Sequence, residues 1–404
     1  MLNVKTPDEV IKIIDSLYLS FDSKSELVDL LNACGRVLHF NISSDENVPN
    51  FNRSTVDGYA VRASDTFGCN ESIPAILNIV SEVLMGESAD VALATGDCAI
   101  VSTGGELPES ADAVVMVEHS ENYGENIVGI QKPVAPGNNV IFNGDDVRIG
   151  QEVLKDGTVL TPHDIGILAA LGHDRVEVRV EPVVGVISTG DELVPTSRVP
   201  VGGQVRDINT PMLLATVTQL GAKAMDFGIV KDDEQAIRNA VLSAVETCDI
   251  CLISGGSSAG ARDMTARVIE SEGELLLHGI AMKPGKPTIL GIVRGKLVFG
   301  LPGHPVAAYM VTELFVRPLI NRLLGSNVKR YSVDARLAEA ISSNHGRAEY
   351  IGVSLIEVDG VYVARPIRGK SGLISSLSGV DGYICVPRDC EGLAKGEAVK
   401  VVYF

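Results

Sequence analysis

The sequence predicts an α/β protein of several domains, in which a doubly wound central domain is flanked by mostly β segments. Two observations lead to this prediction. From residue 182 onward, buried β-like runs alternate with capped helical segments, which is typical of a parallel or mixed sheet covered by helices. On either side, residues 48–139 and the tail from about residue 330 consist of short β-like runs broken by glycine, proline and asparagine.

The segment before residue 48 is expected to be helical. Thr6-Pro7-Asp8-Glu9 is a capping box with proline at the first helical position. Ser23-Lys24-Ser25-Glu26 has the same pattern, and it predicts a second helix that ends at Gly35. A further capped helix is predicted to begin at Thr161-Pro162-His163-Asp164.

Changes in composition divide the chain into four predicted domains. They are an elongated, helix-containing N-terminal domain (1–47 plus 140–175), a β-rich insertion domain (48–139), an α/β domain (176–326) and a small C-terminal barrel or sandwich (327–404). The insertion would therefore interrupt the N-terminal domain, with β-like runs such as Ile76 to Val80, Cys98 to Ser102 and Ala113 to Val117.

Within the α/β domain, strands and helices are expected to alternate. The expected strands are Val183 to Ser188, Lys223 to Val230, Asp249 to Ser254 and Val298 to Leu301. The expected helices are Pro211 to Leu220 (capped by Asn209 or Thr210), about Asp233 to Glu246, one from about Asp263, and about Pro305 to Leu324. Because ligands bind at the carboxyl ends of the strands in such sheets, the loops after these strands form the candidate site.

Composition argues against several classes of function. The 404 residues have a formal net charge of −18, no tryptophan and 4% aromatic residues. Such a surface repels phosphate backbones and anionic membranes, and it offers few rings for stacking on single strands. No apolar run approaches the roughly 18 residues of a membrane span, and the first residues do not resemble a signal peptide. We therefore expect a cytoplasmic protein that binds neither nucleic acid nor membrane.

One pair among the seven cysteines, Cys248 and Cys251, has Cys-x-x-Cys spacing. A zinc site would need a second pair or two suitably spaced histidines, and the sequence has neither. Because the pair falls within an apolar β-like run, we expect it to pack in the core.

Three glycine-containing loops follow strands of the α/β domain. Their backbone N–H groups and the helix N-termini behind them suit a phosphate or another anion. None has the G-x-x-x-x-G-K-[ST] pattern of a P-loop, so Walker-type ATP hydrolysis is not expected. The candidate binding residues in these loops are Ser188, Thr189, Gly190, Asp191, Ser254, Gly255, Gly256, Pro302 and Gly303.

Charged residues near these loops complete the candidate site. Lys283 and Lys286 stand on a proline-stiffened turn that favours an anion well, although two solvated lysines are the simpler alternative. The carboxylates of Glu192, Asp232 and Asp263 suit Mg²⁺ bound together with phosphates. Asp232 and Asp263 also stand where helices are expected to begin, so capping is the alternative role for both.

Seven motifs, in order along essentially the whole chain, resemble the MoeA-type molybdopterin molybdenumtransferase family, which includes the C-terminal domain of gephyrin. The most specific is Pro49 to Ala60, with Ser54-Thr55-Val56-Asp57-Gly58-Tyr59-Ala60. The others are Ser102 to Gly105 with Ala111 to Glu118, Gly137 to Val140 with Gly144 to Asp146, Ser188 to Leu193, Ser254 to Gly256, Lys283 to Pro287 and Gly300 to Gly303. The resemblance implies that the α/β domain is of the MogA/MoaB type.

The resemblance also implies an activity. Family members insert molybdenum from molybdate, and by the same chemistry tungsten from tungstate, into adenylylated molybdopterin with release of AMP. It implies Mg²⁺ as cofactor, the adenylyltransferase that supplies the substrate as a partner, and a homodimer. The active site would lie between the α/β domain of one subunit and the insertion domain of the other. The implied catalytic residues are Asp57, Thr103, Glu192, Asp232 and Asp263, and the implied metal ligands are Glu192, Asp232, Asp263 and Asp146.

Further roles follow by position in the family pattern. Lys283 and Lys286 are expected to neutralise the phosphate link to AMP. Molybdate is expected to bind Arg368, Lys370 and Ser371, within a stretch similar to the family's C-terminal element. Asp57 is expected to position or activate the attacking oxygen of molybdate or water, while a tight Asp-Gly turn is its structural alternative.

The chain departs from the family pattern at two positions. Gly279, beside His278, stands where many relatives have a basic residue, so one anion contact is weakened or passes to His278. His304 stands where relatives often have asparagine, and we expect it to be structural.

Three other functions stay open. The α/β domain resembles that of molybdopterin adenylyltransferases, but the additional domains argue against this activity. A non-catalytic scaffold, as the gephyrin resemblance allows, would not need the acidic residues Asp57, Glu192, Asp232 and Asp263. A nucleotide pyrophosphatase built on the α/β domain would not need the element around Asp57.

Overall fold

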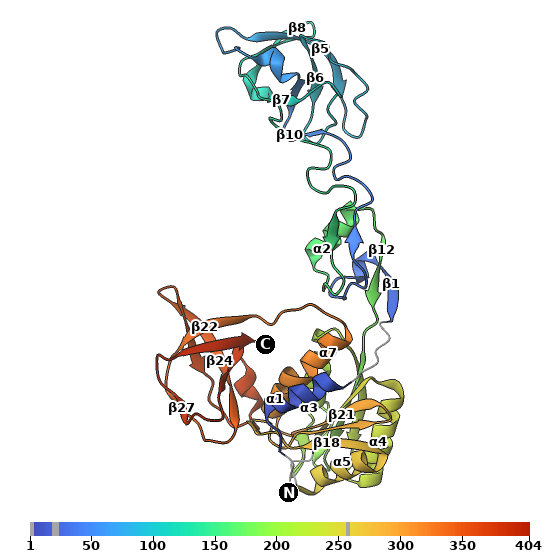
Figure 1. The fold of residues 1–404 in the computed structure, drawn as a ribbon, viewed down its shortest axis with the longest axis vertical. Coiled ribbons are helices and arrows are strands. Elements are labelled where there is room, and N and C mark those ends of the chain that lie inside the picture. Colours follow the sequence, from blue (N-terminus) through green and yellow to red (C-terminus); the bar gives the residue numbers. More distant parts are fainter. Residues whose placement is uncertain (1–3, 18–23, 256–258) are drawn as a thin grey trace.

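The computed structural model describes residues 4–17, 24–255 and 259–404, and for residues 259–262 it describes the backbone alone. The chain is elongated (Figure 1). A β domain lies at one end, and an α/β domain and a C-terminal barrel lie side by side at the other. A small unit around α2 and β12 stands between the two ends.

The α/β domain is built on a six-stranded sheet with the order β16-β13-β17-β21-β20-β18. Four strands run parallel: β13 (Val183–Thr189), β16 (Lys223–Val230), β17 (Ile250–Gly255) and β21 (Lys296–Leu301). The antiparallel strands at one edge are β20 (Ile289–Val293) and β18 (Gly273–His278). The central strands are almost continuously buried, as expected for a sheet covered on both faces.

Helices cover both faces of this sheet, which confirms the predicted doubly wound domain. On one face pack α4 (Glu234–Thr247) and α5 (Ala259–Glu272), with a core that includes Ile237 and Ile269. On the other face pack α3 (Asn209–Gln219), α6 (Pro305–Val311) and α7 (Arg317–Leu323). The N-terminal helix α1 (Pro7–Ser16) joins this second face through Val10 and Ile14, far along the chain from its neighbours.

The expected single helix from Pro305 to Leu324 is interrupted. A π-helical turn, η4 (Thr312–Val316), joins α6 to α7. Pro318 lies at the start of α7 and has no backbone N–H, so the regular hydrogen-bond ladder cannot continue through this point.

Two of the three predicted capping boxes are confirmed. Ser23 of the third lies outside the described residues, and the helix predicted behind it is wrong. Thr6 caps α1 and Thr161 caps α2 (Pro162–Ala170), each with its reciprocal bond. The helix expected after Ser23-Lys24-Ser25-Glu26 is instead the strand β1 (Ser25–Asp29), which is followed by the short 3₁₀ helix η1 (Leu30–Asn32). β1 pairs with β12 (Arg175–Arg179), and this long-range pairing overrides the local helix signal.

The insertion domain is a six-stranded sheet with the order β7-β4-β6-β5-β9-β8. Its strands are β4 (Gly58–Val61), β5 (Ala75–Val83), β6 (Asp97–Val101), β7 (Ala113–Met116), β8 (Ser120–Gly124) and β9 (Ile127–Ile130), and it also holds η2 (Ala63–Thr66) and η3 (Val117–His119). Gly58 is required for the pairing of β4 with β7, because a Cβ there would lie 1.9 Å from the Val115 carbonyl oxygen. The β character predicted for this insertion is confirmed.

Two chain passages connect the insertion domain to the rest of the molecule (Figure 1). They pair with each other in short antiparallel ladders, first β2 (Ile42–Ser43) with β11 (Glu152–Leu154) and then β3 (Arg53–Ser54) with β10 (Val140–Ile141).

The C-terminal domain is a closed five-stranded barrel rather than a sandwich. Its strands are β22 (Ser332–Leu337), β24 (Ala348–Val358), β25 (Val361–Pro366), β26 (Gly382–Val386) and β28 (Ala398–Tyr403). The ring closes because β24 pairs with both β25 and β26. From the α/β domain, β19 (Met282–Lys283) adds to β24 in parallel and thereby joins the two domains. The smaller elements are β14 (Leu193–Val194) with β15 (Val205–Arg206), β23 (Ile341–Ser342) with β27 (Gly392–Leu393), and η5 (Ile374–Leu377).

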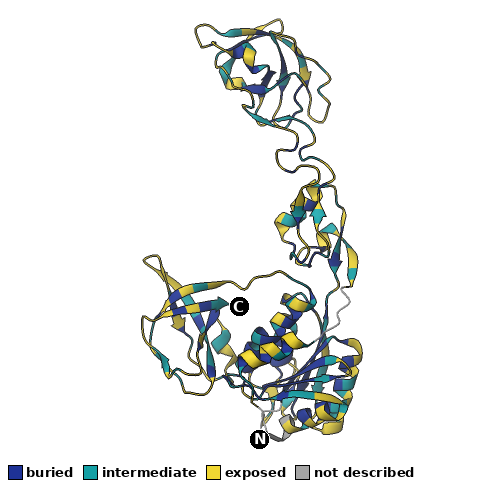
Figure 2. Cartoon of the chain, in the orientation of Figure 1, coloured by how far each residue is buried: buried dark blue, intermediate teal, exposed yellow. Residues whose placement is uncertain are grey.

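Burial is concentrated in the sheets of these units (Figure 2). Cys248 and Cys251 are both buried, and burial raises the pKa of each thiol, which confirms the expected core packing. Within the described part of the chain, no helix has the length and apolarity needed to cross a membrane.

Candidate functional site

Four parallel strands end at the same edge of the α/β sheet, because β16, β13, β17 and β21 are successive neighbours. The loops that follow them therefore lie close together. Asp232 follows β16, Glu192 follows β13, and Pro302 follows β21. The predicted residue Gly256, in the loop after β17, lies outside the described residues.

The carboxylates gather around Asp232. Asp191 accepts a hydrogen bond from the backbone N–H of Asp232 (3.4 Å). Burial raises the pKa of Asp232, and the charges of Asp191 and Glu192 raise it further, whereas a hydrogen bond with Thr189 lowers it. Oδ1 of Asp232 is buried and has no hydrogen-bond partner among the described residues. This oxygen can therefore accept a cation.

The capping alternatives for Asp232 and Asp263 are both wrong. The cap of α4 is Asp233, whose carboxylate accepts from the backbone N–H of Ala236 (2.9 Å). The helix α5 begins at Ala259, so the exposed Asp263 stands one turn inside it. Neither aspartate is needed to start a helix.

The four predicted metal ligands do not meet within one chain. Asp146 lies on the passage to the insertion domain, where its backbone N–H donates to the Val48 carbonyl (3.1 Å). Among the described residues, no three histidine, cysteine or acidic side chains converge on one metal position. A Mg²⁺ ion at this site would therefore have only one or two carboxylate ligands from the protein. Water and phosphate oxygens would fill its other positions.

We expect Asp232→Asn to raise the melting temperature of the metal-free protein slightly at neutral pH. The folded protein holds the Asp232 proton to a higher pH than the unfolded chain does, because its folded-state pKa is raised. Stability therefore falls as pH rises from the ordinary carboxyl range through the raised pKa, and asparagine removes this loss. Thermal scans across this range measure the difference.

The control for this prediction is Glu270→Gln, which removes an exposed carboxylate of α5. This variant should melt like the wild type. Excess Mg²⁺ should raise the melting temperature of the wild type and of the control, but not of Asp232→Asn. A lower melting temperature of Asp232→Asn in metal-free buffer would show that the carboxylate stabilises the fold instead.

Two glycines let the neighbouring strand-end loops approach closely. Gly190 and Gly255 both have φ of 153°, which side chains rarely adopt. A Cβ at Gly255 would lie 2.1 Å from the Thr189 carbonyl oxygen, so no other residue fits there. Ser188, one residue before Thr189, shares a hydrogen bond of 2.7 Å with the hydroxyl of Thr210.

Asn209 is a site residue that the sequence did not reveal. Its Nδ2 donates to Ser254 Oγ (2.8 Å) and to the Gly303 carbonyl (2.9 Å), so it joins the end of β17 to the loop after β21. Its Oδ1 is buried and has no partner among the described residues. Asn209 was expected only as a helix cap, but the cap position of α3 is Ile208, and Asp207 before it accepts from the Thr210 N–H (3.1 Å). The signal that could have revealed Asn209 is a polar residue at the start of a helix beside the strand ends.

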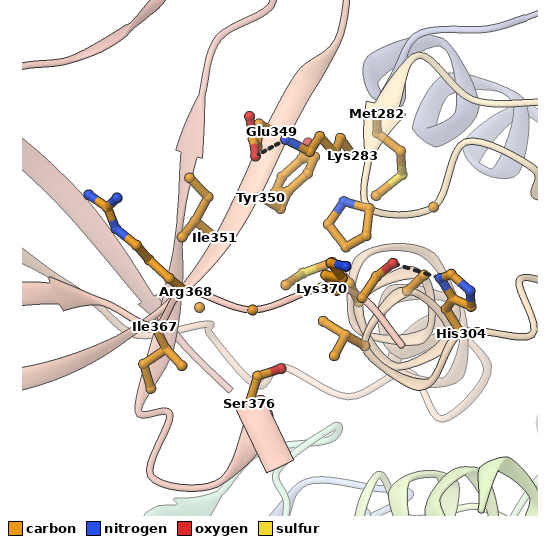
Figure 3. Close-up of a pocket in the computed structure, with 18 of the residues that line it drawn as sticks. Met282, Lys283, His304, Glu349, Tyr350, Ile351, Ile367, Arg368, Lys370 and Ser376 are labelled. Atoms are coloured by element: carbon orange, nitrogen blue, oxygen red, sulfur yellow. Dashed lines mark hydrogen bonds and ion pairs between the residues drawn. The ribbon is translucent and has the colours of Figure 1, made fainter. Parts of the chain in front are cut away.

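A pocket of about 860 Å³ opens between the α/β domain and the barrel (Figure 3). Its walls are the turn after β19, the start of α6 and the barrel loop that precedes η5. We call it the basic pocket. Seven of the predicted binding residues line it, namely Lys283, Lys286, Pro302, Gly303, Arg368, Lys370 and Ser371. Arg347 and Glu349, which the sequence did not single out, line it as well.

Contacts across the basic pocket connect the two domains. Lys283 Nζ lies 2.7 Å from Glu349 Oε1, and His304 Nδ1 lies 2.8 Å from Ser371 Oγ. Arg368 extends away from His304 (Figure 3), and its Nε donates to Glu339 of the barrel (2.9 Å).

Of the two positions at which the chain departs from the family pattern, one lines the basic pocket and the other does not. His304 lines the pocket and connects the start of α6 to the barrel loop through Ser371. Gly279 and His278 do not line it. The Gly279 carbonyl instead accepts from the backbone N–H of Lys5 (3.1 Å), so the N-terminal segment covers this position.

Asp57 is held by Thr103 in the insertion domain. The backbone N–H (2.7 Å) and the hydroxyl (3.0 Å) of Thr103 both donate to Asp57 Oδ1, and these bonds hold the pKa of the carboxyl below its usual range. Gly58 has no positive φ, so the tight-turn alternative is wrong. Within one chain, the insertion domain lies at the opposite end from the α/β domain (Figure 1). The structure therefore does not bring Asp57 to Glu192 in a single subunit.

Comparison with known proteins identifies relatives along nearly the whole chain. Residues 5–172 match the MoeA N-terminal region (domains I and II), residues 185–322 a "Probable molybdopterin binding domain", and residues 334–404 the MoeA C-terminal region (domain IV). A molybdopterin molybdenumtransferase of Bacillus subtilis is 30% identical over 411 residues, which cover 100% of this chain and 95% of the relative.

Two further relatives are archaeal. A Methanocaldococcus jannaschii protein assigned to molybdopterin biosynthesis is 35% identical over 413 residues, which cover 99% of this chain and 98% of the relative. The crystal structure of the molybdopterin biosynthesis MoeA protein from Pyrococcus horikoshii is similar with a TM-score of 0.85 and 34% identity, over 100% of both chains.

Proposed function

Because the chain belongs to the MoeA family of molybdenum cofactor biosynthesis proteins, we propose that it is a molybdopterin molybdenumtransferase. It transfers molybdenum from molybdate to adenylylated molybdopterin and releases AMP. The observation that supports this best is the basic pocket, which lies beside the loop that follows β21 and thus next to the strand-end loops. An oxyanion and a phosphate-bearing substrate can therefore bind side by side.

The basic pocket suits a tetrahedral dianion. Lys283 and Lys286, which were expected to neutralise the phosphate link to AMP, line this pocket together with Lys370, and we propose that they attract the oxyanion instead. In a protein of net charge −18 the pocket is a local well for anions. Ser371 adds a hydroxyl to the wall. Tungstate has the same shape and charge as molybdate, and we propose that the pocket accepts either.

The phosphate link of the substrate is proposed to bind at the neighbouring strand ends. Gly190 and Gly255 let the ends of β13 and β17 pack closely, which gathers backbone groups at this edge of the sheet. Asp232, with Asp191 and Glu192 beside it, would hold Mg²⁺ through its unpartnered oxygen. When bound there, Mg²⁺ would neutralise charge that develops on the phosphate oxygens.

We propose a homodimer, because Asp57 is remote from these loops in one chain. A second subunit would bring its insertion domain to the strand-end loops. Asp57, kept ionised by Thr103, would then position the attacking oxygen of molybdate or water. The adenylyltransferase that makes the substrate is a proposed partner that hands it over.

The test of this function is the release of AMP from adenylylated molybdopterin in the presence of Mg²⁺. Molybdate should stimulate the release, and Lys286→Ala should raise the KM for molybdate about tenfold, because one charge-assisted contact is lost. Lys329→Ala is the matched control, since Lys329 is exposed and lies outside the pocket. Its KM should equal that of the wild type.

Two other outcomes would overturn the proposal. If the protein makes the adenylate from ATP and molybdopterin but releases no AMP from it, it is an adenylyltransferase. If a folded dimer does neither, it acts as a scaffold.

A further inference from the structure

The basic pocket has one carboxylate among its cations. Of the described residues that line it, Lys283, Lys286, Arg347, Arg368 and Lys370 are basic, and Glu349 is the one acid. In a pocket that gathers positive charge for an anion, an acidic side chain works against binding. Glu349 is therefore expected to weaken the binding of anions in the pocket.

Both oxygens of Glu349 are held in place. Its Oε1 lies 2.7 Å from Lys283 Nζ, and its Oε2 accepts from the hydroxyl of Ser343 (2.7 Å). The backbone sets this pair, because Lys283 of β19 and Glu349 of β24 stand opposite each other in the parallel ladder. Figure 3 shows the two side chains joined on one wall of the pocket.

The ion pair between Lys283 and Glu349 contributes little to the stability of the fold. Lys283 is 54% exposed, and ion pairs with such exposed lysines contribute little to folding. The Glu349 side chain, by contrast, is only 13% exposed, so its charge is screened less by water and acts on whatever enters the pocket. The second paired cation of the pocket, Arg368, has its partner Glu339 outside the lining.

We propose that Glu349 is a specificity-determining residue that keeps the affinity of the basic pocket for oxyanions low. It neutralises Lys283 and repels the bound dianion, so that molybdate is transferred rather than retained. This inference rests on the proposed function. Its physical basis is that tight binding of a substrate in its ground state lowers KM without raising kcat.

The charge of the ligand provides a quantitative signature. The repulsion between a fixed carboxylate and a bound anion is proportional to the charge of the anion. Glu349→Gln keeps the acceptor for Lys283 and the contact with Ser343 but removes the charge. We therefore expect it to increase affinity about threefold for a tetrahedral monoanion and about tenfold for a dianion of the same shape.

The experiment is titration calorimetry of the full-length protein with tungstate, a dianion, and perrhenate, a monoanion of the same geometry. The matched control is Glu357→Gln, which removes an exposed carboxylate further along β24. It should leave both affinities unchanged. In turnover, Glu349→Gln should lower the KM for molybdate and lower kcat as well.

Three outcomes would overturn the inference. If Glu349→Gln binds tungstate no better than the wild type, Glu349 does not limit affinity, and the proposed function still stands. If the variant binds more weakly although its melting temperature is unchanged, Glu349 only orients Lys283. If the wild type binds neither tungstate nor molybdate, the proposed function fails together with the inference.

Discussion

Replacing Asp57 by asparagine is expected to slow AMP release about a thousandfold, within the range that a positioned acid or base supplies. Asparagine has the same size and can still accept from Thr103, whose N–H and hydroxyl both donate to Asp57. It loses the charge that we propose to position the attacking oxygen. Tungstate affinity should not fall, because the basic residues of the pocket are unchanged. Single-turnover AMP release and calorimetry measure the two quantities.

Mixing variants provides the control for this result. Asp57→Asn and Glu192→Gln should each be inactive alone. If the site is shared between subunits, a mixed dimer holds one site with both wild-type residues, so exchange of subunits should restore part of the activity. An unchanged rate for Asp57→Asn would remove Asp57 from the mechanism, and a mixture without activity would contradict the shared site.

The sequence predicted best those elements that depend on short-range patterns. The central strands of the α/β sheet are mainly apolar, buried runs, and the edge strand β16 has the predicted bounds, Lys223–Val230. The capping boxes at Thr6 and Thr161 were correct, and the helices behind them bury apolar residues, Val10 and Ile14 in α1 and Leu168 in α2. The same pattern at Ser23-Lys24-Ser25-Glu26 gave a wrong helix, since β12 arrives from much later in the sequence and pairs with this segment.

The sequence predicted those parts of the candidate site that lie in loops directly after parallel strands. The loops of Glu192 and Pro302 follow parallel strands, and their proximity follows from the order of the sheet. Glu349 was not predicted, because it reaches the pocket only through the pairing of β24 of the barrel with β19 of the α/β domain. No local pattern encodes this contact between domains. The relation of Asp57 to the other acids would depend in the same way on the second subunit that we propose.

The contact between the α/β domain and the barrel also rests on a buried charge cluster. Glu313, in the π-helical turn η4, is fully buried. Its two oxygens accept from Arg317 (2.7 and 2.8 Å) and one of them also from Arg330 (2.8 Å). The Arg330 guanidinium lies 5.1 Å from the ring centroid of Tyr383, on the barrel strand β26. The cluster thus connects the helix that follows the pocket wall α6 to the barrel.

Glu313→Ala is expected to destabilise the protein by about 3 kcal/mol, the lower end of the cost of breaking a buried ion pair, because both arginines keep some access to water. Urea unfolding measures the change. The matched control is Glu234→Ala, which breaks an exposed pair with Arg267 (2.8 Å) and should cost less than about 1 kcal/mol.

The same variant should also weaken tungstate binding, because the basic pocket lies between the two domains that the cluster joins. Replacing Glu313, Arg317 and Arg330 together by apolar residues of similar volume should recover most of the stability, since no unpaired buried charge is left. If the triple variant regains stability and tungstate affinity together, apolar packing suffices to hold the barrel against α6. If stability returns without affinity, the charges themselves fix the orientation of the barrel that forms the pocket. Equal costs for Glu313→Ala and Glu234→Ala would show that the cluster stabilises nothing.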